Sequence, residues 1–275
     1  MTSSSRYPVA LTIAGSDSGG GAGIQADLRT FAFHRVHGTS VLTCVTAQNT
    51  VGVTRVDALS PEAVVAQMEA VTSDITVNAI KTGMLLNDGI IHAVSDLIGQ
   101  LPHPIPTVVD PVMVSRAGAQ LIDDAAVATL TERLIPQATI LTPNRYEAEL
   151  LTGLTLATLA DMEAAARQIY QLGPQAVLVK GGGMADDLKG TDVWFDGQTL
   201  EVLTTEIVHT PNTHGTGCTL SAAIAANLAL GKPALDAVRA AKQYVTQALH
   251  HSLTIGQGQG PVGHFYPLLS LDSQS

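Results

Sequence analysis

The 275-residue sequence is poor in aromatic side chains and in positive charge. Aromatic residues make up 4% of the chain although 45% of it is hydrophobic, so Ala, Val, Leu and Ile must build the interior. That mixture suits parallel strands buried between helices. Only 14 Lys and Arg face 24 Asp and Glu, and no basic stripe exists to neutralise a nucleic acid. Nucleic-acid binding is therefore excluded as the main role.

Long apolar runs are also missing, because no stretch of about 18 apolar residues is present to span a membrane. The first residues, 1–6, are not followed by an apolar segment long enough for a secretion signal. Cys44 and Cys218 are the only cysteines and have no metal-type spacing, which favours a reducing compartment. We expect a cytoplasmic protein.

Apolar runs alternate with segments of helical period along the whole chain. The expected strands are residues 9–14, 39–47, 79–83, 107–109, 139–141 and 176–180. The expected helices are 24–33, 61–71, 88–98, 123–134, 146–151, 159–172, a helix after Gly217, and 234–250. This order predicts βαβ units, a mainly parallel sheet and helices on both of its faces.

One segment departs from the alternation, where Asp196-Gly197 separates two short apolar runs, 192–195 and 199–204. Asp-Gly is a strong signal for a β-hairpin. No linker or internal repeat interrupts the chain, so we predict one domain over residues 1–275, with residues 1–7 and 268–275 as flexible ends.

The most informative motif is Asn-Thr-His-Gly-Thr-Gly-Cys at 212–218, which leads into a strong helix former. Backbone N–H groups of Gly215, Thr216 and Gly217 would point out of the helix start and form an anion site, suited to phosphate or a developing phosphoryl charge. The alternative is that the two glycines only make a tight turn before a buried helix.

Acidic and amide side chains follow two of the expected strands. Asp110 ends one apolar strand, and Asn144 and Glu147 lie three apart after another, so the latter two share a helix face. An Asp and a Glu suit a hydrated Mg²⁺. An N-cap at Asn144 with an exposed Glu147 explains the same pattern, and both interpretations remain open.

Two lysines are ambiguous on pattern alone. Lys180 ends a strand before three glycines, where a phosphate can approach the backbone, yet an ordinary strand-end lysine fits equally well. Lys242 has the pattern of a surface residue on the last helix.

The glycine-rich segment 15–23 lacks the acidic residue of a dinucleotide site, and no Walker A motif is present.

Taken together, these motifs resemble the ribokinase-like kinases, and within them the hydroxymethylpyrimidine/phosphomethylpyrimidine kinases of thiamine biosynthesis. The matching segments occur in family order and span nearly the whole chain. They are residues 14–17, 20–27, 46–50, 81–84, 109–113, 142–147, 180–182, 212–218 and 260–262. Ser18 and Gln257 differ from the residues common at these positions in relatives, but these two differences do not weaken the resemblance.

The resemblance implies a three-layer α/β/α ribokinase-like fold, a homodimer, and use of ATP and Mg²⁺. It implies phosphorylation of 4-amino-5-hydroxymethyl-2-methylpyrimidine to its monophosphate and then to the diphosphate. The implied residues are Gly15, Asp27, Gln48, Met84 and Val112 around the pyrimidine, Asp110 and Glu147 at the metal, Asn144, Lys180, Thr213 and Lys242 at the nucleotide, and Gly215, Thr216, Gly217 and Cys218 in catalysis.

The implied pyrimidine contacts agree with side-chain chemistry. Gln48 offers a planar donor and acceptor set that complements an aminopyrimidine edge. Met84 and Val112 can pack on the ring faces, although each taken alone reads as core packing.

Cys218 stands where the wider family's sugar kinases carry an aspartate as catalytic base. At a helix N-terminus we expect its pKa to fall below the free value of about 8.5. A weak base suffices for a loose phosphoryl-transfer transition state. In the second step the nucleophile is already anionic, and a neutral thiol tolerates both substrates. The alternative is a small buried thiol without a chemical role.

Two rival functions remain open on sequence. One is a pyridoxal kinase of the same subfamily, since some relatives with the Gly-Thr-Gly-Cys motif accept pyridoxal. A pyrimidine-binding regulatory protein without catalysis is the other rival, and the joint presence of Asp110, Glu147, Lys180 and the backbone anion site argues against it.

Overall fold

The computed structural model describes residues 7–113, 121–185 and 188–272. Its strands are β1 (Val9–Asp17), β2 (His37–Gln48), β3 (Val53–Ala58), β4 (Ala79–Thr82), β5 (Thr107–Val109), β6 (Ile140–Leu141), β7 (Val177–Val179), β8 (Asp192–Phe195) and β9 (Leu200–Leu203). Its α-helices are α1 (Gly23–Phe33), α2 (Pro61–Thr72), α3 (Asp88–Gly99), α4 (Asp124–Thr129), α5 (Arg145–Thr152), α6 (Leu159–Tyr170), α7 (Thr216–Ala229), α8 (Ala234–His250) and α9 (Tyr266–Asp272).

The strands form one sheet in the order β3-β2-β1-β4-β5-β6-β7-β8-β9. The six strands from β2 to β7 in this order pair in parallel, which confirms the predicted βαβ units. The predicted hairpin is present as β8 and β9, which pair antiparallel across a turn where Gly197 has a φ of 89°.

Three parts of the chain differ from the expected elements. Strand β3 is additional: it pairs antiparallel with β2 at the sheet edge, and all six of its residues are exposed, so its sequence carries no alternation of buried and exposed positions. The helix expected to reach residue 134 ends at Thr129 and continues as a π-helical segment, Leu130–Leu134. Residues 268–272 belong to α9, whereas 1–6 and 273–275 lie outside the described residues.

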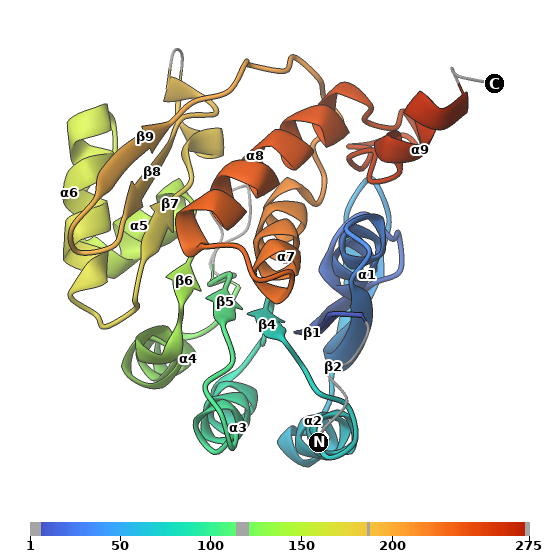
Figure 1. The fold of residues 1–275 in the computed structure, drawn as a ribbon, viewed down its shortest axis with the longest axis vertical. Helices are drawn as coiled ribbons and strands as arrows, with labels where there is room; N and C mark the ends of the chain where they lie inside the picture. The colour runs from blue at the N-terminus through green and yellow to red at the C-terminus, as the bar shows by residue number, and fades with distance from the viewer. Residues whose placement is uncertain (1–6, 114–120, 186–187, 273–275) are drawn as a thin grey trace.

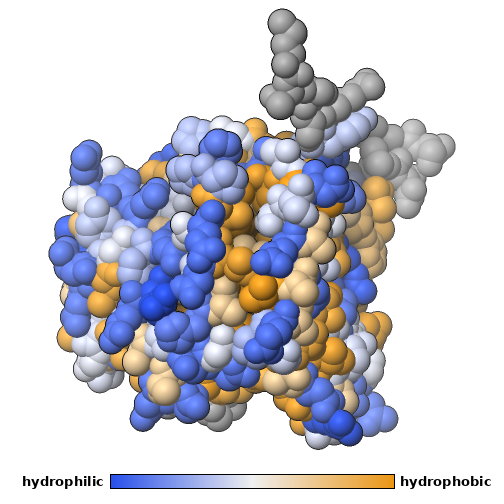
Figure 2. All heavy atoms as spheres, turned by 90° about the horizontal axis from the view of Figure 1, so that it is seen from below, coloured by the Kyte–Doolittle hydropathy of each residue, from blue (hydrophilic) through white to orange (hydrophobic). Residues whose placement is uncertain are grey.

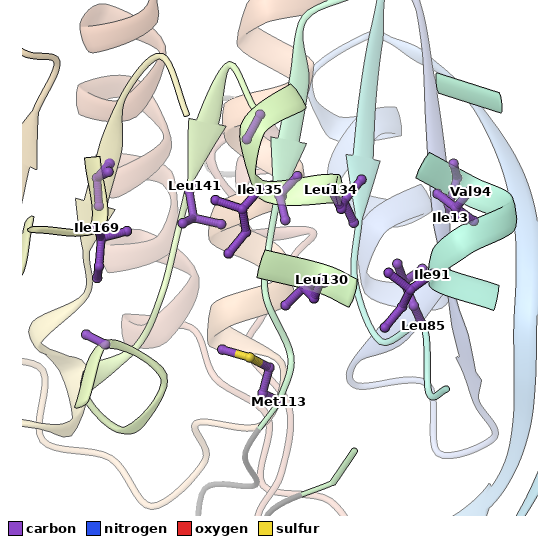
Figure 3. Close-up of a cluster of buried hydrophobic side chains, with 14 of the residues drawn as sticks. Ile13, Leu85, Ile91, Val94, Met113, Leu130, Leu134, Ile135, Leu141 and Ile169 are labelled. Atoms are coloured by element: carbon purple, nitrogen blue, oxygen red, sulfur yellow. The ribbon is translucent and has the colours of Figure 1, made fainter. Parts of the chain in front are cut away.

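Helices cover both faces of the sheet, so the predicted three layers are confirmed. Figure 1 shows α2, α3 and α4 along one face and α1, α7 and α8 along the other. On the first face a cluster of aliphatic side chains fills the space between sheet and helices, and Figure 3 shows Val94 of α3 beside Ile13 of β1 and Ile91 beside Leu85. The second face is packed mainly by alanines and other small residues of α7.

The surface below α2, α3 and α4 is largely hydrophilic, with smaller hydrophobic patches between the polar residues (Figure 2). Within the described part of the chain, no helix combines the length and the apolar character needed to cross a membrane.

The strand order creates a switch point at β1. The chain passes from β1 to β2 on one side and continues to β4 on the other, so the loops that follow these strands diverge. In open α/β sheets, ligands bind at the carboxyl ends of the strands beside such a point. The fold therefore places the candidate site at this edge, where β1, β4, β5, β6 and β7 end.

One glycine on this edge is required by the packing of the backbone. A Cβ added to Gly181 would lie 1.8 Å from the carbonyl oxygen of Thr191, whereas a Cβ at the neighbouring Gly182 would meet nothing within 4 Å. We expect Gly181→Ala to lower the free energy of unfolding by about 1–3 kcal/mol, and Gly182→Ala to change it little. Chemical denaturation of the two variants measures the difference, and equal stabilities would contradict the packing described.

Candidate active site

The predicted site residues gather at the carboxyl edge of the sheet. Seven of them stand in or shortly after a strand: Gly15 in β1, Gln48 at the end of β2, Met84 after β4, Asp110 and Val112 after β5, Asn144 after β6 and Lys180 after β7. Thr213 and the residues 215–218 come from the start of α7. The remaining three, Asp27, Glu147 and Lys242, come from α1, α5 and α8.

The start of α7 has the features of a backbone anion site. Gly215 precedes the helix in a left-handed conformation with a φ of 79°, and no side chain caps the helix. Its first turn carries no acidic residue, so no side chain of that turn neutralises the positive end of the helix dipole. A Cβ at Gly215 would lie 1.7 Å from the carbonyl oxygen of Gly21, so glycine is needed for the approach of the two loops.

Gly217 brings this helix start beside a buried ion pair. A Cβ at Gly217 would lie 3.6 Å from Lys180 Nζ and 3.9 Å from Asp110 Oδ2. Lys180 Nζ is 2.8 Å from Asp110 Oδ1, and Ser221 Oγ of α7 donates to Asp110 Oδ2 at 3.1 Å. Burial opposes ionisation of Asp110, but Lys180 and Lys81 outweigh it and lower the pKa of this carboxyl. The arrangement thus holds a carboxylate and an ammonium group against the anion site.

Two interpretations were open for Asn144 and Glu147, a Mg²⁺ site and an N-cap with an exposed glutamate, and the structure agrees with part of each. Asn144 caps α5 by accepting from the Glu147 N–H at 3.0 Å, and Glu147 Oε2 accepts from the Asn144 N–H at 2.7 Å. The expected N-cap is therefore present, but Glu147 is buried rather than exposed. Burial, with a smaller contribution from Asp110, raises the pKa of Glu147 to about 8, against the opposing charge of Lys180.

Asp110 and Glu147 interact electrostatically and both face Lys180. Among the described residues no group of three His, Cys, Asp or Glu is placed to hold a metal ion. A pair of carboxylates still fits Mg²⁺, which keeps several waters and takes one or two carboxylates from a protein. The donor set therefore matches the predicted metal.

Cys218 lies in the first turn of α7, and its expected low pKa is wrong. Burial raises the pKa of the thiol, and the carboxylates of Asp27 and Asp110 add to the shift, while Lys81 opposes it. The helix N-terminus does not compensate for the loss of water around the sulfur. The half-buried Cys218 therefore has a raised pKa, which favours its protonated form.

Asp27 does not lie on the surface of the site. Its side chain is fully buried, and Oδ2 accepts from Lys81 Nζ at 2.8 Å and from Thr12 Oγ1 at 2.6 Å. Burial lowers the pKa of Lys81, but the charge and hydrogen bond of Asp27, together with Cys218 and Asp110, outweigh this effect and raise the pKa. The Asp27–Lys81 pair therefore forms a charged layer beneath the site. Lys81 could have been noticed as a charge inside an otherwise apolar strand.

Lys242 is buried, so its expected surface position is wrong. Its Nζ donates to Asp192 Oδ2 and to the carbonyl oxygen of Gly190, each at 2.6 Å. Asp192 Oδ1 in turn accepts from the N–H of Gly181 at 2.9 Å. Lys242 thereby fixes the glycine turn that follows Lys180.

The opposite side of the site is less polar. A Cβ at Gly15 would lie 2.7 Å from Cys44 Sγ and 3.0 Å from Met84 Cε, so these residues converge at the end of β1. Gln48, Met84 and Val112 are each half-buried, as side chains that line a site would be.

Asp17 and His214 join the two glycine loops and were not singled out by the sequence analysis. His214 Nε2 is 2.8 Å from Asp17 Oδ2, which also accepts from the N–H groups of Gly21 and Ala22. Burial opposes ionisation of Asp17, but His214 lowers the pKa of the carboxyl below its usual value. The sequence feature that could have identified them is the position of an aspartate and a histidine inside two glycine-rich motifs.

Comparison with known proteins agrees with this geometry. The family model described as phosphomethylpyrimidine kinase matches residues 17–263. A Synechococcus elongatus protein named hydroxymethylpyrimidine/phosphomethylpyrimidine kinase is 64% identical over 261 residues, covering 95% of this chain and 98% of that protein. One of the same name from Bacillus subtilis is 46% identical over 256 residues, covering 93% and 94%.

Solved structures give the same result for the fold. An ADP complex of Bacillus subtilis pyridoxal kinase matches with a TM-score of 0.87 at 41% identity, over 96% of this chain and 99% of that one. The phosphomethylpyrimidine kinase of Clostridium difficile matches with a TM-score of 0.78 at 41% identity, over 88% and 99%. The sheet and its helices are those of the ribokinase-like fold. By sequence and by structure, the chain belongs to the phosphomethylpyrimidine kinase family.

Proposed function

We propose that this protein transfers the γ-phosphoryl group of ATP to 4-amino-5-hydroxymethyl-2-methylpyrimidine, and then to the resulting monophosphate, for thiamine biosynthesis. The observation that carries the proposal is the meeting of the uncapped start of α7 with the Asp110–Lys180 pair at Gly217. Relatives named as kinases of both steps support the two-step substrate sequence.

Phosphoryl transfer depends mainly on positioning and on neutralising the charge of the transferring group. The backbone N–H groups of residues 215–218 and the ammonium group of Lys180 supply that neutralisation at fixed positions. We assign Mg²⁺ to Asp110 and Glu147, where it would neutralise phosphate charge when bound. Asn144, Thr213 and Lys242 are assigned to the nucleotide side.

The acceptor alcohol is assigned to the less polar side of the site. There Met84 and Val112 can contact the faces of a ring, and Gln48 can pair with its polar edge. Gly15 lets Cys44 and Met84 pack closely against the end of β1, where a side chain would collide with them. Asp27 would act on the substrate from beneath, through Lys81, because it has no exposed atom.

Pyridoxal phosphorylation is the second candidate. It is favoured by the match to Bacillus subtilis pyridoxal kinase at a TM-score of 0.87, although the sequence is more similar, at 64% identity, to a relative named for the pyrimidine substrates. The two acceptors share a hydroxymethyl group on a six-membered aromatic ring. A binding site can therefore distinguish them only by the polar groups at their ring edges.

We expect the purified protein to convert the pyrimidine alcohol to its monophosphate and diphosphate when ATP and Mg²⁺ are supplied. Chromatography of the products over time resolves the two steps, and the same assay with pyridoxal measures the rival activity. Chelation of Mg²⁺ by EDTA should abolish both steps. A clear preference for pyridoxal, or release of no ADP with either alcohol, would overturn the proposal.

We assign Cys218 to the position beside the acceptor, which two different acceptors occupy in turn during the two phosphorylation steps. The first acceptor is a neutral alcohol, and the second is a phosphate oxygen that already carries charge. Because burial keeps the thiol neutral, it repels neither acceptor, whereas an aspartate would repel the second. The backbone N–H groups then provide most of the charge stabilisation.

We expect Cys218→Asp to slow the second phosphorylation at least tenfold more than the first, through an increase in the barrier of about 1.4 kcal/mol. Separate assays started from the alcohol and from the monophosphate give the two rates. Cys218→Ser, which is also neutral, is the matched control and should affect both steps by similar factors. Equal slowing of the two steps by Cys218→Asp would contradict this role.

We propose that the protein is a homodimer formed through the edge of the sheet at β3. Exposed valines, Val51, Val53 and Val56, lie on or beside this strand, with exposed fractions between 44% and 71%. An edge strand offers backbone groups for pairing with a second copy, and the exposed valines beside the Arg55–Asp57 ion pair add hydrophobic surface.

Light scattering should therefore give a dimer for the native protein and a monomer for Val56→Lys. Leu230→Lys, at a residue of similar exposure near the end of α7, is the control and should leave the dimer intact. A native protein that is monomeric at micromolar concentration would contradict the interface.

We further propose a cytoplasmic location, because Cys44 and Cys218 are both free thiols and the proposed reaction consumes ATP. Recovery of the protein from the secreted or membrane fraction of its host would contradict this.

A further inference from the structure

The carboxamide of Gln48 lies between two side chains that restrict its orientation. One of its terminal atoms, Nε2, is 3.3 Å from His214 Nε2, and the other, Oε1, is 3.3 Å from Thr46 Oγ1. The oxygen and nitrogen of a carboxamide have nearly the same shape, so the protons on the neighbouring groups decide which atom faces which neighbour.

His214 Nε2 offers Gln48 an N–H and no lone pair, because its single proton points to Asp17 Oδ2 at 2.8 Å and can only be shared with the Gln48 atom at 3.3 Å. An ionised carboxylate only accepts hydrogen bonds. Nε2 therefore carries a proton in the neutral imidazole as well as in the charged form. A protonated Nε2 cannot accept from the amide nitrogen of Gln48, so the favourable neighbour is the amide oxygen.

Thr46 presents an acceptor to Gln48. Its hydroxyl has a single proton, and Oγ1 lies 2.9 Å from the carbonyl oxygen of Ser16, closer than to Gln48. The proton goes to the carbonyl oxygen, which leaves lone pairs on Oγ1. The favourable Gln48 atom on this side is the amide nitrogen, so both neighbours select the same orientation.

We infer that His214, oriented by Asp17, and Thr46 are positioning residues that fix the Gln48 carboxamide with its oxygen toward His214 and its nitrogen toward Thr46. In this orientation Gln48 keeps one N–H and one oxygen lone pair for a ligand. The inference rests on the proposed function, in which Gln48 pairs with the edge of a pyrimidine.

A Gln48 carboxamide of fixed orientation distinguishes between two pyrimidines whose ring edges have nearly the same shape. The 4-aminopyrimidine edge presents an N–H donor beside a ring-nitrogen acceptor, whereas a 4-oxopyrimidine presents a carbonyl acceptor beside a ring N–H donor. A carboxamide free to turn over could pair with either edge. A carboxamide held at both ends pairs with one edge and leaves unmatched donors and acceptors against the other.

The test is calorimetric binding of two probes to the full-length protein without nucleotide. The probes are 4-amino-5-hydroxymethyl-2-methylpyrimidine and the corresponding 4-oxo compound. We expect the native protein to bind the amino compound at least ~100-fold more tightly. His214→Leu, which removes the donor, should reduce this ratio by about tenfold or more.

The matched control is His214→Gln, whose amide nitrogen can restore a donor to the oxygen of Gln48 and should recover most of the ratio. A general structural defect would weaken both probes equally and leave the ratio unchanged, which would overturn the inference. If His214→Leu does not fold, Thr46→Val removes the other neighbour, and an unchanged ratio there has the same meaning. Failure of the native protein to bind the amino compound would instead overturn the proposed function.

Discussion

The close approach of α7 to the ends of β1, β5 and β7 is the constraint on which the site depends. Gly215 lies against the carbonyl oxygen of Gly21, and Gly217 lies against Asp110 and Lys180. A Cβ at Gly215 would collide with this oxygen, so glycine is needed there for the approach, whereas a Cβ at Gly217 would make only ordinary contacts with the ion pair. The Ser221 hydrogen bond to Asp110, one turn further along α7, holds the helix to the same carboxylate.

Four charges beneath this contact carry a cost for stability. Burial opposes the ionisation of Asp27, Lys81, Asp110 and Lys180, and removing such charges from water is costly. The ion pairs outweigh this effect on the pKa of Lys81, Asp110 and Lys180, whereas the pKa of Asp27 stays raised. Hydrophobic residues of similar volume would pack there at less cost. Their retention is explained by the electrostatic field that they place at the anion site, where a transferring phosphoryl group needs fixed counter-charge.

The sequence predicted the elements with strong periodicity and the residues at strand ends. Asp110, Asn144 and Lys180 could be placed together because parallel strands end at one edge of a sheet. Strand β3 could not be predicted, since its exposed residues have no buried face. The burial of Lys242 depends on its partner Asp192, fifty residues away, and the Asp17–His214 pair joins loops 197 residues apart. Such long-range polar pairs leave no local pattern.

The corrected pKa of Cys218 links these buried charges to the two-step chemistry. Position at a helix start favours a thiolate, yet the sulfur shares its surroundings with the carboxylates of Asp27 and Asp110, and burial has the largest effect. An aspartate at residue 218 would add a third carboxylate to this region and would face an anionic acceptor in the second step. A neutral thiol avoids both repulsions, so charge stabilisation must come from the α7 backbone and Lys180. The same environment that weakens Cys218 as a base therefore makes the site compatible with an acceptor that already carries a phosphate.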